Sequence, residues 1–226
     1  SSTSKDLKKR VESYLIHHFG YSPDVILENH HLCHMASSFF HSGFKESMIV
    51  SIDGVGDKVS TALGFGRANK IKILETKGLV QSLGIFYQTM TQLLGFNSVG
   101  DEYKLMGISA YGKKRIDLDK IIKLESVDFK INKSFYRKSL TYHNFSEPRY
   151  DHLFINNKKN LKRRYSSEKF DNIHKNLAYS IQAYYEDAII SLVKKLFLKT
   201  GISNLCLAGG CALNSVANMK LSNLHY

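Results

Sequence analysis

The sequence predicts an α/β domain, because short apolar runs alternate along the chain with segments that have helical spacing. Of its 226 residues, 43% are hydrophobic and 12% are aromatic, which is enough to build a buried core in one large domain or two small ones. Near the end of the chain, NLCLAGGCALNSVANMKL predicts a buried strand, a glycine turn and the first turns of a helix. A strand, a glycine turn and a helix in this order form a place where a nucleotide can bind.

The first part of the chain is expected to form a helix and then a strand meander. ENHHLCHMASSFF, at residues 28–40, fits a buried helix, and SMIVSID, at residues 47–53, fits a short strand that ends in a glycine-bearing turn. STALGFGR and KIKILETK follow as further strand candidates, separated by the turn RANK. These strands are therefore predicted to lie side by side in chain order.

Two more helices are predicted after the meander. The first has apolar residues at helical spacing, with Ser82 as the expected N-cap and Gly95 as the expected C-cap. Its aromatic pair, Phe86 and Tyr87, is interpreted as core rather than as a platform for a ligand. Residues 166–200 form a long amphipathic stretch with Ser and Glu near its start and cations and Gly at its end, which is typical of a helix.

The formal net charge of +12 raises the question of a nucleic-acid partner, since Lys and Arg can neutralise phosphates. Much of this charge lies in a variable basic segment, residues 113–165, where the composition turns polar. Such a segment is more typical of a solvated surface than of a nucleic-acid groove, and a basic wall that faces an anionic nucleotide is the alternative. Nucleic acid is therefore not expected as the partner.

The composition also favours a cytoplasmic protein with no membrane segment. No apolar run approaches the roughly 18 residues that span a bilayer, and SSTSKDLKKR lacks the apolar core of a secretory signal. Cys33, Cys206 and Cys211 do not have the pair spacing of a metal site. Their odd number and apolar surroundings predict reduced, packed thiols rather than a disulfide framework.

The expected helix at residues 28–40 contains a group of histidines. His30 and His34 are four residues apart, so on a helix they share one face and can hold one metal ion from the same side. Asp53 is the candidate anionic ligand, because it ends an apolar strand just before the glycines of GVGD. The alternative, which local spacing alone favours, is that both histidines are partly buried helix residues and that Asp53 starts a turn. His31 is assigned to packing or to support behind the ligands.

Three segments resemble, in the same order, the O-carbamoyltransferases that modify nodulation factors and several antibiotics. They are ENHHLCHMASSFFHSGFKESMIVSIDGVGD, SVGDEYKLMGISAYG and NLCLAGGCALNSVANMKL, and they cover most of residues 28–112 and 170–226. The resemblance implies a fold similar to the actin, sugar-kinase and Hsp70 ATPases, a ribonuclease H-like fold shared with the enzymes that carbamoylate a threonyl adenosine in tRNA. It also implies that carbamoyl phosphate and ATP give carbamoyladenylate in a second domain, and that the actin-like domain moves the carbamoyl group to a substrate hydroxyl.

The resemblance also implies roles for individual residues. A divalent transition metal, iron or zinc, is expected on His30, His34 and Asp53, the same set that the local chemistry suggests. The expected contacts with ATP or carbamoyladenylate fall on Gly54, Gly56, Gly209, Gly210 and Asn214. Ordinary turns are the alternative for these glycines. Lys104 is a candidate for binding the anionic donor, with a surface ion pair as its alternative, and no residue is assigned as the catalytic base.

Other parts of the family pattern are not recognised in the chain. Family members begin with a strand hairpin containing a His-Asp-Ser-type stretch, and they continue to a Gly-Asp segment with a fourth metal ligand and to a carbamoyladenylate-forming domain. Residues 1–226 are therefore expected to be the middle portion of an O-carbamoyltransferase, incomplete at both ends and inactive alone. A relative of the tRNA threonylcarbamoyladenosine enzymes and a non-catalytic nucleotide-binding remnant stay open as alternatives. The expected acceptor is a small-molecule hydroxyl, on a sugar, a glycolipid or an antibiotic.

Overall fold

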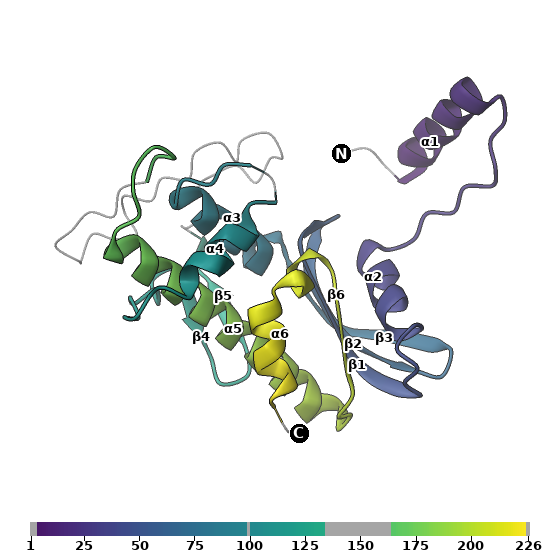
Figure 1. Ribbon diagram of the computed structural model, residues 1–226. Helices are drawn as coiled ribbons and strands as arrows, with labels where there is room; N and C mark the ends of the chain where they lie inside the picture. Colours follow the sequence, from purple (N-terminus) through teal and green to yellow (C-terminus); the bar gives the residue numbers. More distant parts are fainter. Residues whose placement is uncertain (1–3, 99, 134–163, 225–226) are drawn as a thin grey trace.

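The computed structural model describes residues 4–98, 100–133 and 164–224. Its main sheet is mixed (Figure 1). β1 (Glu46–Gly56), β2 (Val59–Arg67) and β3 (Lys70–Gly78) are antiparallel neighbours, and β6 (Leu205–Ala208) pairs with β1 in parallel. The strand order β3-β2-β1-β6 confirms the predicted meander, the predicted late strand and the α/β class.

The parallel pairing of β1 with β6 brings two distant chain segments to the same edge of the sheet. Ser51 is the register partner of Ala208, so Asp53, near the carboxyl end of β1, and Gly209, directly after β6, lie at the same edge of the sheet. The strand was predicted to end at Asp53, but β1 continues to Gly56. A parallel pair needs a long crossover connection, and α5 (Asn172–Thr200) is the longest element in the connection here. Ligands of open α/β sheets bind beyond such carboxyl ends, which is where the predicted site residues lie.

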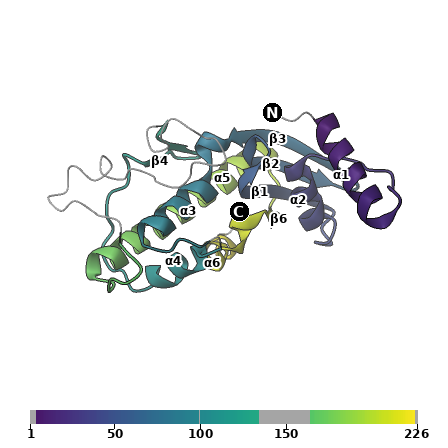
Figure 2. The ribbon, with the colours of Figure 1, turned by 90° about the horizontal axis from the view of Figure 1, so that it is seen from above.

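Helices cover both faces of the sheet. α2 (His30–Phe39) packs on one face, where Met35 joins a small core cluster with Ile49. α3 (Leu83–Leu93) and α5 pack on the other face, in the main core that contains Val50. Figure 2 shows α2 and the α3–α5 group on opposite sides of the strands. Successive residues of β1 thus point to different cores, as the period of a strand requires.

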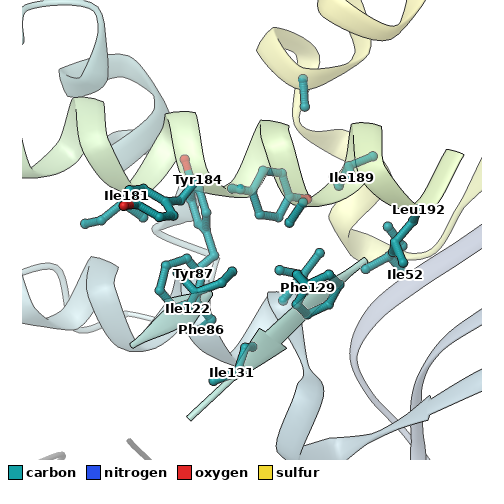
Figure 3. Packing of buried hydrophobic residues seen from close by; sticks show 14 of the residues in the cluster. Ile52, Phe86, Tyr87, Ile122, Phe129, Ile131, Ile181, Tyr184, Ile189 and Leu192 are labelled. Atoms are coloured by element: carbon teal, nitrogen blue, oxygen red, sulfur yellow. The ribbon is translucent and has the colours of Figure 1, made fainter. Parts of the chain in front are cut away.

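A small hairpin of β4 (Ile122–Leu124) and β5 (Phe129–Ile131) closes the main core. Figure 3 shows Phe129 in the same buried cluster as Phe86 of α3 and residues of α5. Phe86 is fully buried, which confirms its predicted place in the core. The remaining elements are α1 (Ser4–Phe19), α4 (Glu102–Ser109), α6 (Ser215–Ser222) and the short 3₁₀ turns η1 (Leu79–Gln81) and η4 (Gly210–Leu213).

Two helix boundaries differ from the prediction. Ser82 caps α3 as predicted, but the C-cap is Leu94, and Gly95 follows it with a φ of 85°. A glycine just beyond the C-cap supplies the left-handed backbone that commonly ends a helix. α5 begins at Asn172 rather than at residue 166, because the side chain of Asp171 accepts hydrogen bonds from the first free N–H groups.

Other predictions concern the cysteines, the basic segment and a possible membrane span. Cys206 is buried and Cys211 is partly buried, but Cys33 is exposed on α2, so the prediction that all three thiols are packed was wrong for Cys33. All three are free thiols, as predicted. Most of the predicted basic segment, residues 134–163, lies outside the described residues. Among the helices that the structure describes, none is long and apolar enough to cross a membrane.

Candidate functional site

The two predicted metal-ligating histidines meet the predicted aspartate at the end of β1. Asn29 caps α2 by accepting a hydrogen bond from the Leu32 N–H at 2.9 Å, so the helix starts at His30. The Oδ2 atom of Asp53 lies 3.0 Å from Nε2 of His30 and 3.0 Å from Nε2 of His34. One carboxylate oxygen therefore contacts both imidazoles.

Neighbouring residues shape this cluster without joining it. A β-carbon on Gly56 would lie 2.3 Å from Cδ2 of His30, so the glycine makes room for the imidazole. His31 is buried, with its Nδ1 2.7 Å from the Ser51 hydroxyl and its Nε2 3.2 Å from the Val59 carbonyl. Burial lowers the pKa of His31, despite the opposing effect of the Val59 carbonyl. These contacts confirm that His31 packs behind the predicted ligands.

Asp53 is held in its ionised form. Burial by itself raises the pKa of the Asp53 carboxyl, but hydrogen bonds from both imidazoles and from the Gly54 N–H outweigh burial and hold the pKa below its ordinary value. The Gly54 N–H donates to Oδ1 at 2.8 Å, while the imidazoles contact Oδ2. The carboxylate is therefore fixed in orientation from both of its oxygens.

This donor set fits a divalent transition metal. The ligand atoms of His30, His34 and Asp53 all lie within 4.8 Å of one another. Two ligand atoms that bind one ion at about 2.0–2.1 Å, with an angle of about 90–110° between them, are about 3 Å apart. The contacts of 3.0 Å made by Asp53 Oδ2 match this spacing. Two imidazoles and a carboxylate suit both iron and zinc.

A pocket of about 530 Å³ opens beside Asp53. Its walls come from the end of β1, from α3, α4 and α5, and from the η4 turn, and its lining includes Asp53, Gly54, Gly84, Tyr87, Gly210 and Asn214. This volume lies within the range of about 300–1,000 Å³ that is common for small-molecule sites. Asp53 belongs both to the candidate metal cluster and to the lining of the pocket, so the two share this carboxylate.

The structure places the predicted nucleotide-binding glycines in different surroundings. Gly54 and Gly210 line the pocket, whereas Gly56 lies against the His30 ring. The Gly54 N–H is bonded to the Asp53 carboxylate, so it does not point freely toward a phosphate. Gly209 has a φ of 86°, and a β-carbon there would lie 2.3 Å from the Ile52 carbonyl oxygen, so this glycine allows β6 to approach β1. Nucleotide contacts by these glycines stay predictions.

Residues 5–224 match the family model described as "Carbamoyltransferase N-terminus". The chain belongs to this carbamoyltransferase family. The match spans nearly the whole chain and includes every candidate site residue. The resemblance on the three sequence segments is thereby confirmed.

Curated relatives extend beyond this chain. An uncharacterized protein of Synechocystis sp. is 35% identical over 205 residues, which cover 88% of this chain and 32% of the relative. Nodulation protein NolNO of Sinorhizobium fredii is 31% identical over 219 residues, 96% of this chain and 30% of its own length. Nodulation protein NolO of Bradyrhizobium diazoefficiens is 31% identical over 194 residues, 85% and 33% of the two lengths. The chain spans about a third of the length of these relatives.

In this carbamoyltransferase chain, the start of α3 supports the last residues of β1, which follow Asp53. The Ser82 hydroxyl donates to the Gly54 carbonyl at 2.7 Å and accepts the Ile85 N–H at 3.0 Å. Capping of α3 and placement of the end of β1 thus depend on one hydroxyl. The sequence identified Ser82 as a cap, but its contact with Gly54 depends on tertiary structure. Gly84 was also missed, although an isolated glycine in the first turn of a helix is a signal of close packing.

Lys104 of the carbamoyltransferase chain forms an ion pair on α4. Its Nζ lies 2.6 Å from Oδ1 of Asp101 and 5.5 Å from the centre of the Phe96 ring. The hydrogen bond from Lys104 holds the pKa of Asp101 below its ordinary value. The ion pair weighed as the alternative is therefore present, and donor binding by Lys104 stays a prediction. The neighbouring Glu102 lines the pocket.

Proposed function

We propose that this carbamoyltransferase chain binds a divalent transition metal, iron or zinc, together with ATP or carbamoyladenylate. In the proposed reaction, the carbamoyl group moves from carbamoyladenylate to the hydroxyl of a small-molecule acceptor. The observation that carries the proposal is that Asp53 contacts both imidazoles and also lines the pocket. A donor in this pocket can place its reacting end beside the candidate metal position.

The proposed chemistry assigns distinct tasks to the residues around the pocket. His30, His34 and Asp53 would hold the metal, which supplies Lewis-acid stabilisation of the negative charge that develops as adenylate leaves. Asp53 would contribute the anionic ligand through Oδ2, because the Gly54 N–H donates to its other oxygen, Oδ1, at 2.8 Å. Gly210 leaves space beside the carboxylate, since a β-carbon there would lie 3.2 Å from Asp53 Oδ1.

The fold and the relatives support the same proposal. A mixed sheet with helices on both faces is compatible with the actin-like, ribonuclease H-like fold that we propose. Two relatives are described as nodulation proteins, which supports a sugar, glycolipid or antibiotic acceptor over tRNA. Filter binding checks this choice: retention of tRNA at physiological salt would favour the tRNA branch.

Calorimetric titration with ATP tests the nucleotide site. We expect the wild-type chain to bind ATP in the presence of Zn²⁺, and we expect Gly210→Val to lose binding because its side chain enters the space beside Asp53. Equal binding by the two proteins, or no binding by either, would contradict the proposed nucleotide site. Mass spectrometry then tests transfer, with premade carbamoyladenylate and a set of sugar and aminoglycoside acceptors. We expect no product from these 226 residues alone, because no catalytic base is assigned among them, and a carbamoylated product that His34→Ala abolishes would contradict this expectation and establish the transfer.

A further inference from the structure

The pocket beside Asp53 extends along the η4 turn to a mouth with large, exposed side chains. Gly210 lies at the inner end, since a β-carbon there would lie 3.2 Å from Asp53 Oδ1. Leu213, three residues later in η4, also lines the pocket. Residues three apart in a 3₁₀ helix share a face and are about 6 Å apart along its axis. The pocket therefore runs from the carboxylate of Asp53 along this face of η4 to Leu213.

Helix α4 forms another side of this mouth. Tyr103 and Met106 both line the pocket, and they share one face of α4 because they are three residues apart. The Met106 sulfur lies 3.8 Å from the hydroxyl oxygen of Ser215, the first residue of α6. This contact brings the face of α4 that carries Tyr103 close to the segment that carries Leu213. Tyr103 is 63% exposed and Leu213 is 83% exposed, so a ligand can reach both side chains.

Two polar side chains of the pocket wall are already hydrogen-bonded within the protein. The Tyr87 hydroxyl donates to Oε1 of Gln182 at 2.6 Å, and Asn214 exchanges two hydrogen bonds with the Gln182 amide, at 2.9 and 3.1 Å. Tyr87 and Asn214 are also hydrogen-bonded to each other. A ligand is therefore expected to gain affinity at this wall from shape and from contact with its surface, rather than from new hydrogen bonds to Tyr87 and Asn214.

Tyr103 offers an aromatic ring at the mouth. The Lys104 ammonium lies over this ring, 5.7 Å from its centre, and is held by its ion pair with Asp101. A cation within about 6 Å of a ring centre attracts the ring. The ring is thus restrained by Lys104, while the exposed part of the residue stays accessible from the pocket. Such a ring suits a nucleotide base, because every base has a π face that can stack on an aromatic side chain.

We propose that Tyr103 binds the base of the nucleotide by stacking at the mouth of the pocket. This inference rests on the proposed nucleotide site and deepens it, because it assigns the two ends of the ligand. The phosphate end lies toward Asp53, and the base lies against Tyr103. Stacking requires a π face and no particular pattern of donors and acceptors. The site should therefore bind ATP and inosine triphosphate about equally, and a triphosphate without a base more weakly.

Calorimetry with matched tyrosine variants tests this assignment. Tyr103→Ala removes the ring, and Tyr111→Ala removes a tyrosine that is 70% exposed just after α4 and does not line the pocket. In the presence of Zn²⁺, we expect Tyr103→Ala to bind ATP about 10-fold more weakly than the wild type. Tyr111→Ala and the conservative Tyr103→Phe should bind ATP as the wild type does.

Ribose 5-triphosphate, which has no base, is the ligand control. The wild type and Tyr103→Ala should bind it with equal affinity, because the lost contact is with the base. Equal affinity of the wild type and Tyr103→Ala for ATP would overturn the proposal. An equal loss of affinity for ATP and for ribose 5-triphosphate in Tyr103→Ala would also overturn it.

Fluorescence detects the stacking contact itself. The chain contains no tryptophan, so Tyr103→Trp and Tyr111→Trp each introduce a single indole. We expect ATP to quench the emission of Tyr103→Trp saturably, with the Kd that calorimetry gives for the same variant, and to leave the emission of Tyr111→Trp unchanged. Binding of ATP to Tyr103→Trp without quenching would overturn the stacking and leave the nucleotide site intact. Failure of the wild type to bind ATP would contradict the nucleotide site and this inference together.

Discussion

A β-carbon on Gly84 would lie 2.6 Å from the Cα atom of Gly54 and 2.7 Å from its nitrogen. The first turn of α3 therefore packs directly on the backbone that follows Asp53. Ser82, the N-cap residue just before α3, supports the same packing, because its hydroxyl donates to the Gly54 carbonyl oxygen at 2.7 Å. The position of the Asp53 carboxylate thus depends on a close approach that a larger residue at position 84 cannot make.

Gly84→Ala should destabilise the protein, because the atoms that meet the new methyl group belong to the backbone and cannot rotate away. Overpacking of this kind costs about 1–3 kcal/mol. Gly107→Ala is the control: its position lies within α4, where a β-carbon would meet nothing within 4 Å. That substitution should stabilise by about 0.5–1 kcal/mol, since alanine favours helix more than glycine does. Urea unfolding measures both, and a Gly84→Ala protein as stable as the wild type would contradict the packing described.

His34→Ala should weaken metal binding strongly, because it removes one of the three candidate ligands. The expected loss exceeds the roughly 10–100-fold that follows removal of a partner outside the ligand set. His41→Ala is the control, since the His41 ring contacts the Ser37 carbonyl at 3.0 Å and lies outside the cluster. A competition titration with a zinc chelator measures both affinities. Equal affinity of the two variants would exclude His34 as a ligand.

The amount that the sequence could predict depends on how local each contact is. His30 and His34 share a helix face by spacing alone, and Asp53 precedes the glycines of GVGD near the end of β1, so the cluster followed from the sequence and from the family resemblance. The contacts of Gln182 could not be predicted in this way. Its partners lie 95 residues before it and 32 residues after it, and they meet only because three helices pack around the pocket.

The neighbours of the glycines could not be predicted from the sequence either. The sequence indicates that the backbone at Gly56 or Gly209 approaches something closely, but it does not identify the neighbour. The structure places Gly56 against His30 and Gly209 against Ile52. The late start of α5 has a local cause, because Asp171 caps the helix, and Ser166 and Ser167 earlier in the segment are equally good N-cap residues by type.

A third prediction concerns the ion-pair network formed by Lys77, Asp128, Lys195 and Glu75. Asp128 contacts Lys77 at 2.5 Å and Lys195 at 2.7 Å, and Lys195 also pairs with Glu75. Burial raises the pKa of Asp128, but hydrogen bonds from Lys195 and Lys77 outweigh burial and hold the pKa below its ordinary value. The pairs on Glu75 lower its pKa in the same way, against burial.

The sign of the resulting pH effect follows from linkage. A carboxyl with a lower pKa in the folded state stabilises the protein above its unfolded-state pKa, and this contribution is lost as the pH falls through the folded-state value. The free energy of unfolding should therefore decrease below about pH 4. Asp128→Asn should lower the free energy of unfolding by about 1–3 kcal/mol at pH 7 and should reduce the further decrease of this free energy in acid.

Asp24→Asn is the control, because that side chain is 89% exposed. Urea unfolding at pH 7, 5, 4 and 3 measures these values, and an unchanged acid loss in Asp128→Asn would contradict the role of the network.

Anomalous X-ray diffraction from crystals grown with Zn²⁺ tests the metal site most directly, because it locates the ion without assuming its ligands. The predicted result is a strong peak about 2.0–2.2 Å from Nε2 of His30, from Nε2 of His34 and from a carboxylate oxygen of Asp53. Crystals of His34→Ala grown in the same way provide the control, and the peak should be weak or absent there. A map of the wild-type protein with no peak at these atoms would contradict the site, and the proposed metal-dependent carbamoyl transfer with it.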